Sequence, residues 1–206
     1  MDNRSRTADI LLLCSLCVFL LTAAWAQGRS SSLYGSTVRL HVLAVDESEY
    51  EQSIKLNVRD KVLECITPLL SGVKESQEAE AIITENLSRI AEAAGSASMG
   101  RRVSVSLSDE FYPTRDYEGF TLPAGRYKSL KVTLGEGKGH NWWCVVYPPL
   151  CMGLSEGEEL SEYLSGGDVR LITEGEGVRF RLKIVEIWEN IVASRIGRDY
   201  NPLIKN

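Results

Sequence analysis

The residues best suited to covalent chemistry are a histidine and a cysteine four positions apart. His140 and Cys144 lie in the run GEGKGHNWWCVVYPPLC, residues 135–151. A thiolate nucleophile needs a base within hydrogen-bond reach and a third group that orients the base, a role for which Asn141 is a candidate. Side chains on a strand alternate between faces, so Cys144 would face one side of a sheet while His140 stays in the glycine-rich loop. An exported thiol-dependent hydrolase or redox enzyme that uses Cys144 and His140 is therefore the alternative function.

The other residues that carry chemistry do not form a metal or phosphate site. The chain has two histidines and five cysteines, and their spacing matches no zinc-binding pattern, so we predict no metal and no cofactor. His41 is predicted on the exposed face of a strand, and Asp109 and Glu110 as solvated charges on opposite faces. Residues 135–139 (GEGKG) are dense in glycine, but a strand rather than a helix is expected after them. They therefore predict a mobile connection and not a phosphate loop.

A disulfide bond between Cys144 and Cys151 is a further prediction. The two cysteines are seven positions apart, with Pro148 and Pro149 between them. An extended chain of this length spans about 23 Å, whereas a disulfide requires Cα atoms within about 7 Å, so the chain must reverse at the prolines. Export would make oxidation feasible. The alternative is two small buried thiols.

Two consecutive tryptophans give the same segment the composition of a protein-binding surface. On a strand, Trp142 and Trp143 point to opposite faces, which favours exposure of one ring near Tyr147. Large aromatic side chains supply much of the energy of protein interfaces. The alternative is that both rings belong to the core. The candidate partner-binding residues are Asn141, Trp142, Trp143, Tyr147, Pro148 and Pro149.

The composition is that of one ordinary globular domain with an acidic charge. The chain has 206 residues, and 23 Lys and Arg stand against 28 Asp and Glu, which gives a net charge of −5. Because there is no surplus of cations to neutralise phosphates, no nucleic-acid partner is expected. The acidity also disfavours adhesion to anionic lipid by charge alone, so a protein partner is favoured.

The first 26 residues have the features of an export signal. Residues 10–26 (ILLLCSLCVFLLTAAWA) carry no charge, and Arg4 and Arg6 precede them. Ala24 and Ala26 have the small-x-small spacing of a signal cleavage site, which predicts cleavage after Ala26, with an uncleaved membrane anchor as the alternative. Residues 27–35 predict a flexible spacer, and residues 36–206 a single globular domain. Membrane contact is expected only through the N-terminal segment.

Hydrophobic periodicity predicts an α+β fold. Alternating apolar residues predict strands near residues 37–45, 102–107, 117–120, 127–134, 141–147, 169–173 and 178–184. Helical spacing predicts a long helix after the Ser48-x-x-Glu51 capping box, a second helix over residues 76–94, a short helix over residues 156–164 and a terminal helix near 187–196. Short connections favour antiparallel pairing. We expect a mostly antiparallel sheet with a helical hairpin and a C-terminal helix packed on one face.

Three stretches of the sequence resemble the stage II sporulation protein R family. They are VRLHVLAVDESEYEQSIKLNVRDKVLE (38–64), FYPTRDYEGFTLPAGRYKSLKVTLGEGKGHNWWCVVYPPLC (111–151) and FRLKIVEIWE (180–189). The resemblance covers most of residues 36–190, and its GEGxGxNWWCVxxPPLC run is long and compositionally rare. Family members usually have an HVxANSD-like stretch at the first strand, where this chain has Leu43-Ala-Val-Asp46.

The resemblance implies a secreted intercellular signal of sporulation that is not an enzyme. Such a protein is made in the forespore and exported into the intermembrane space, and residues 36–206 would be its signalling domain. The implied partner is a membrane-embedded aspartic protease of the mother cell, stage II sporulation protein GA, which cleaves the precursor of the sporulation factor sigma-E. The resemblance implies no catalytic or ligand-binding residues for this chain.

Overall fold

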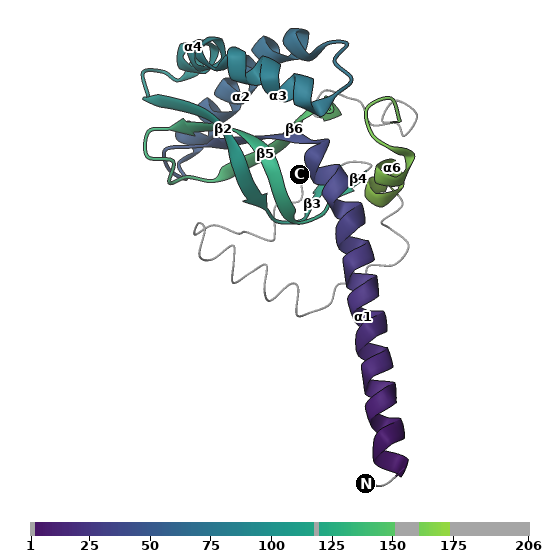
Figure 1. Ribbon diagram of the computed structural model, residues 1–206. Helices are drawn as coiled ribbons and strands as arrows, with labels where there is room; N and C mark the ends of the chain where they lie inside the picture. Colours follow the sequence, from purple (N-terminus) through teal and green to yellow (C-terminus); the bar gives the residue numbers. More distant parts are fainter. Residues whose placement is uncertain (1–2, 118–119, 151–160, 174–206) are drawn as a thin grey trace.

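The computed structural model describes residues 3–117, 120–150 and 161–173 of the 206-residue chain (Figure 1). The elements are α1 (Asn3–Gly35), β1 (Val38–Leu43), α2 (Glu49–Leu70), α3 (Ser76–Glu85), α4 (Leu87–Ala97), β2 (Val103–Tyr112), β3 (Arg115–Tyr117), β4 (Phe120–Leu122), β5 (Gly125–Leu134), β6 (Asn141–Tyr147) and α6 (Gly166–Thr173). Residues 156–160 of the predicted short helix, and the predicted last strand and terminal helix near residues 178–184 and 187–196, lie outside the described residues.

Among the described residues, four strands form one mixed sheet in the order β2-β5-β1-β6, and β3 and β4 form a separate two-stranded ribbon. β2 pairs antiparallel with β5 and β6 pairs antiparallel with β1, whereas β1 and β5 are parallel. The predicted α+β class with a mostly antiparallel sheet is thus confirmed. The parallel pair is possible because the chain passes through α2, α3, α4, β2, β3 and β4 between β1 and β5, and parallel strands require such a long connection.

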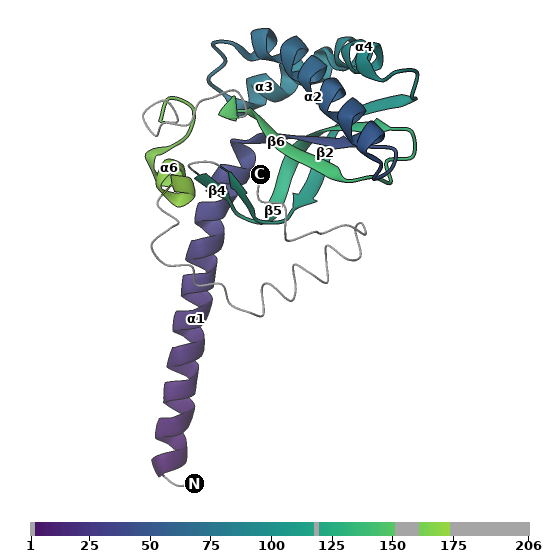
Figure 2. The same ribbon diagram turned by 180° about the vertical axis from the view of Figure 1, so that it is seen from behind.

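The helices α2, α3 and α4 cover one face of the sheet, as the opposite views in Figures 1 and 2 show. Alternation along the strands sends apolar side chains such as Leu40 of β1 and Leu130 of β5 to this helix-covered face, and both are fully buried. Ile54, Val58 and Val62 of α2 meet them at helical spacing. Each buried side chain of this size stabilises the fold by about 1.5–3 kcal/mol relative to exposure. This layer is the larger core.

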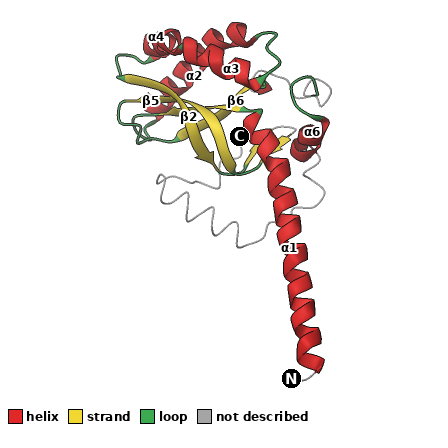
Figure 3. Ribbon diagram, viewed as in Figure 1, coloured by secondary structure: helices red, strands yellow, loops and turns green. Residues whose placement is uncertain are grey.

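The helix expected over residues 76–94 is two helices, α3 and α4, that meet at Asn86 (Figure 3). Asn86 has φ −102° and ψ 10°, and its side-chain amide donates a hydrogen bond to the Ile82 carbonyl oxygen at 2.8 Å. Asparagine side chains compete in this way for backbone hydrogen bonds, so they interrupt helices in which the apolar spacing continues. α4 packs against α2.

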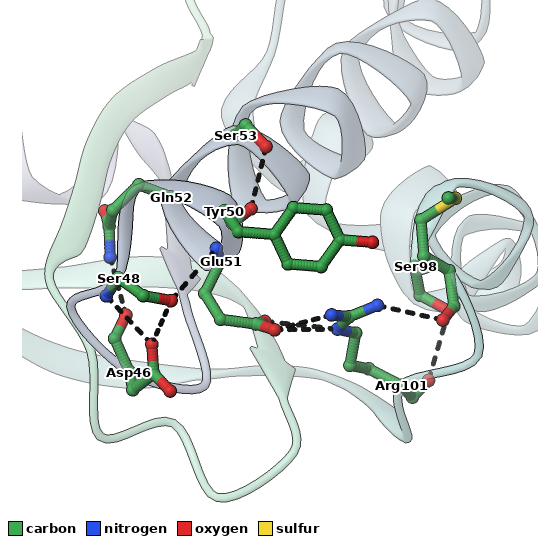
Figure 4. A network of polar contacts seen from close by, with 9 residues as sticks. Asp46, Ser48, Tyr50, Glu51, Gln52, Ser53, Ser98 and Arg101 are labelled. Atoms are coloured by element: carbon green, nitrogen blue, oxygen red, sulfur yellow. Dashed lines mark hydrogen bonds and ion pairs between the residues drawn. The ribbon is translucent and has the colours of Figure 1, made fainter.

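The start of α2 is fixed by a network of polar contacts (Figure 4). Ser48 caps the helix, since its side-chain oxygen accepts a hydrogen bond from the Glu51 backbone N–H at 3.4 Å. The Glu51 carboxylate accepts hydrogen bonds from the Arg101 guanidinium instead of reaching back to Ser48. The predicted capping box is therefore half formed, and its acidic member ties α2 to the connection between α4 and β2.

The opposite face of the sheet is covered in part by the end of α1, by α6 and by the β3–β4 ribbon. Leu33, Phe120, Val145 and Ile172 form a second, smaller core there. Residues 161–173 include α6, where the sequence predicted a strand at 169–173. The helix forms because Ser165 caps it, accepting a hydrogen bond from the Asp168 backbone N–H at 3.2 Å.

Residues 27–35, expected to be a flexible spacer, are helical in the structure and belong to α1. Leu33 is fully buried, and the Ser32 hydroxyl donates to the Asp168 carboxylate at 2.9 Å. These tertiary contacts fix a segment whose serine-rich composition favours disorder. Among the described residues, no helix combines the length and the apolarity needed to cross a membrane. Export and cleavage after Ala26 stay predictions.

Candidate functional site

A cluster of polar and aromatic side chains covers the sheet face that lies opposite the helices α2–α4. We call this set the polar face. Its members are Arg39 and His41 of β1, Glu110 and Tyr112 of β2, Ser129 and Lys131 of β5, and Asn141 and Trp143 of β6. They share one face because side chains two positions apart on a strand point the same way. The pairing of neighbouring strands, such as His41 with Trp143 and His41 with Lys131, then brings them together.

His41 lies at the centre of the polar face and is buried, with 4% of its surface exposed. Its Nδ1 lies 2.9 Å from the Glu110 carboxylate, and its Nε2 lies 2.8 Å from the Asn141 side-chain oxygen. The ring also stacks on Trp143, with centroids 3.8 Å apart and planes inclined by 17°. Hydrogen bonds at both nitrogens and a stacked neighbour hold the imidazole in one orientation.

Glu110 receives hydrogen bonds from three side chains. Besides His41, the Ser129 hydroxyl donates to it at 2.9 Å and the Lys131 ammonium at 2.8 Å. Burial raises the pKa of Glu110, but the hydrogen bond and charge of His41 and the hydrogen bonds from Lys131 and Ser129 outweigh burial and lower this pKa from 4.5 to about 2. Glu110 is thus a carboxylate held in its charged form.

Arg39 is the most deeply buried charge of the polar face, with none of its surface exposed. Its guanidinium carbon lies 4.0 Å from the ring centroid of Tyr112 and 5.0 Å from that of Tyr127. Its Nη2 donates to the hydroxyl of Tyr117 on β3. Burial raises the pKa values of Tyr112 and Tyr127, while the charge of Arg39 acts to lower them. Both tyrosines are therefore neutral rings facing a cation.

The polar face does not contain an assembled nucleophile and base. Both ring nitrogens of His41 contact a carboxylate or an amide, and in the described part of the chain no hydroxyl or thiol is bonded to them. The Ser129 hydroxyl contacts Glu110 and Tyr112 instead. What the arrangement offers is a rigid, partly exposed surface in which Trp143 is fixed by its neighbours.

The residues of the alternative thiol enzyme are not arranged for catalysis. Cys144 packs in the larger core on the helix-covered face and is disulfide-bonded, so it has no free thiol. His140 lies with its Nε2 3.4 Å from the Glu47 carboxylate. Cys151 lies outside the described residues, and the Cys144–Cys151 pairing stays a prediction. In the described ranges, His, Cys, Asp and Glu side chains form no group that could hold a metal ion.

The six residues predicted to bind a partner lie on or directly after β6, but they do not share one surface. Trp142 points to the helix-covered face, where the Arg59 guanidinium lies 4.4 Å from its ring centroid. Trp143 and Asn141 lie on the polar face. Tyr147 and Pro148 are buried, and Pro149 is half-buried. Burial raises the pKa of Tyr147 to about 12.

The glycine-rich connection, residues 135–139, was expected to be mobile, but in the structure hydrogen bonds hold it in place. The backbone N–H groups of Lys138 and Gly139 donate to the carbonyl oxygens of Val45 and Ala44 at 3.2 and 3.0 Å. A Cβ atom at Gly139 would lie 2.1 Å from the Asp46 carbonyl oxygen. Glycine is therefore required here because the connection packs directly on the backbone that follows β1.

Sequence reasoning missed Arg39, His41 and Glu110 as members of a shared site. The expectation that His41 points away from the helix-covered face is correct, but the side chain is buried. Asp109 and Glu110 do point to opposite faces, and the Asp109 side chain is 58% exposed as predicted, whereas that of Glu110 is 16% exposed. The available signal was an arginine and a histidine at alternate positions of one strand, Arg39 and His41, together with Glu110 on another.

Comparison with known proteins identifies the family. The sequence model of the stage II sporulation protein R family matches residues 35–156. The chain belongs to this family. Stage II sporulation protein R of Bacillus subtilis (strain 168) is 33% identical over 146 residues, which are 68% of this chain and 65% of that protein. No solved structure matches the chain. The matched region contains the four-stranded sheet and the whole polar face.

Proposed function

We propose that the chain is a secreted signalling protein of sporulation, made in the forespore and exported into the intermembrane space. Membership of the stage II sporulation protein R family supports a role in sporulation. The uncharged residues 10–26 after Arg4 and Arg6 support export. In this proposal the N-terminal segment directs export, and the domain carries the signal.

The proposed partner is the membrane-embedded aspartic protease of the mother cell, stage II sporulation protein GA. The chain binds this protease and activates it, and the protease then cleaves the sigma-E precursor. The chain itself makes and breaks no covalent bond in this step. The geometry supports binding over catalysis because His41 has a carboxylate and an amide as its bonded neighbours, and Cys144 is disulfide-bonded.

The observation that carries the proposal is the fixed, half-buried ring of Trp143 on the polar face. His41 stacks on one side of the ring, the Tyr112 ring meets it edge-on with centroids 4.6 Å apart, and the Arg115 guanidinium lies 5.8 Å from its centroid. A tryptophan ordered before binding loses little side-chain entropy when a partner covers it. Aromatic residues held in this way are the typical hot spots of protein interfaces.

Neighbouring tryptophans allow a matched test. Trp143→Ala removes the ring on the polar face, and Trp142→Ala removes the same ring from the helix-covered face. Both variants should be expressed in sporulating cells and tested for secretion, and purified for circular dichroism. We expect a folded Trp143→Ala to abolish cleavage of the sigma-E precursor and a folded Trp142→Ala to retain it. Normal cleavage with a folded Trp143→Ala would exclude the polar face as the contact.

A further inference from the structure

The guanidinium of Arg39 is buried with hydrogen-bond donors that have no acceptor. In the described part of the chain its Nη2 bonds to Tyr117, whereas Nε and Nη1 are buried and have no hydrogen-bond partner. The rings of Tyr112 and Tyr127 attract the cation through their faces, but a ring face does not replace an acceptor in the plane of the guanidinium. A buried cation whose donors lack acceptors destabilises the folded state unless an anion binds to them.

The neighbouring carboxylate, that of Glu110, is not the missing acceptor for Arg39. Glu110 accepts hydrogen bonds from His41, Ser129 and Lys131, so its oxygens are already engaged. In the described part of the chain, the Arg39 guanidinium contacts no carboxylate. The positive charge of this guanidinium is complementary to that of an acidic ligand.

We propose that Arg39 is a carboxylate-binding site that receives an aspartate or glutamate side chain of the partner protein. The guanidinium fork matches a planar carboxylate, which accepts parallel hydrogen bonds from adjacent N–H groups. That the carboxylate comes from a protein rests on the proposed signalling function. The carboxylate chemistry itself rests on the unmatched Nε and Nη1 donors.

Tyr117 is the described residue whose side chain accepts a hydrogen bond from Arg39. Tyr117 is half-buried and stacks on Phe120, with ring centroids 4.8 Å apart. It lies on β3, a strand of three residues that pairs with β4 of the same length and, among the described strands, with no other. In the proposed complex, the carboxylate takes the place of the Tyr117 hydroxyl at Nη2.

The test follows the side-chain Nε–H resonances of the ¹⁵N-labelled full chain. Sodium acetate is titrated against sodium chloride at equal ionic strength, followed by an acetyl-Gly-Glu-Gly amide peptide and its Gln counterpart. We expect acetate and the Glu peptide to shift the Arg39 resonance saturably, and chloride and the Gln peptide to leave it unchanged. Arg59 is the internal control, because its Nε already donates to the Asp60 carboxylate at 2.8 Å. Absence of an acetate-specific shift at Arg39, or an equal shift at Arg59, would overturn the proposal.

A variant separates the carboxylate site from its protein source. Arg39→Lys keeps the charge and removes the fork, so acetate affinity, followed in a folded variant by intrinsic tryptophan fluorescence, should fall about tenfold or more. The same variant should fail to activate the protease. Acetate binding by the wild type together with full activation by Arg39→Lys would refute the protein source. Absence of acetate binding by the wild type would refute the carboxylate site but not the proposed function, which the Trp143→Ala test decides separately.

Discussion

The Glu110 carboxylate, which is bonded to His41, Ser129 and Lys131, makes a pH-dependent contribution to stability that one substitution exposes. Glu110→Gln removes the charge but keeps the shape of the side chain, and it leaves His41 and Lys131 without their carboxylate. The pKa of Glu110 falls from 4.5 to about 2 on folding, and each pKa unit corresponds to about 1.4 kcal/mol. The charged carboxylate therefore stabilises the folded state by about 3 kcal/mol near neutral pH.

The sign of the pH dependence follows from the direction of this shift. Because the folded state holds Glu110 at a lower pKa than the unfolded state, its contribution is complete above pH 4.5 and is lost as the pH falls towards about 2. At about pH 3 roughly 1 kcal/mol of it remains. Urea denaturation of wild type and Glu110→Gln should show a stability difference near 3 kcal/mol at about pH 7 that narrows at about pH 3.

Asp109→Asn is the matched control on the same strand. The Asp109 side chain is 58% exposed and lies 3.5 Å from the Lys128 ammonium, so its removal should cost less than about 1 kcal/mol at either pH. The reasoning is refuted if Glu110→Gln costs no more than this control. It is also refuted if the cost of Glu110→Gln is the same at both pH values.

Two further substitutions test how the domain is held together. Gly139→Ala places a Cβ 2.1 Å from the Asp46 carbonyl oxygen and should lower the free energy of unfolding, measured by urea denaturation, by about 1–3 kcal/mol. As a control, the added Cβ of Gly95→Ala, in a helix, meets no atom within 4 Å, so this variant should be as stable as wild type or more stable. Equal effects of the two substitutions would contradict the close packing of the glycine-rich connection. Cys144→Ser breaks a disulfide and should cost about 2–4 kcal/mol under oxidising conditions, and Cys65→Ser, at a free thiol, should cost less. A Cys144→Ser variant as stable as wild type would show that the bond does not stabilise the domain.

The sheet and its helix-covered face could be predicted from the sequence because they depend on local periodicity. Alternation placed Leu40 and Leu130 on strands, and helical spacing placed Ile54 and Val58 on α2. The break at Asn86 and the helix α6 were missed. Both are set by hydrogen bonds of single polar side chains, which compete with the propensity of the surrounding apolar residues.

The polar face could not be predicted from the sequence because its contacts join residues far apart in the chain. Glu110 lies 69 positions from His41, and Asn141 lies 100 positions from it. Alternation predicts which residues of one strand share a face, but it does not predict which strands are neighbours in the sheet. That order, β2-β5-β1-β6, depends on the parallel pairing of β1 with β5, which short-loop reasoning did not foresee.

The central claim is that this protein acts by binding a partner through its polar face and not by catalysing a reaction. The most direct measurement is reconstitution of the purified full chain with vesicles that carry the protease and the sigma-E precursor, with the chain titrated at fixed protease concentration. An activator that acts by binding should give cleavage that saturates at a fixed ratio of chain to protease and stops when the chain is removed. Full and lasting activation by a small fraction of that amount would contradict the account.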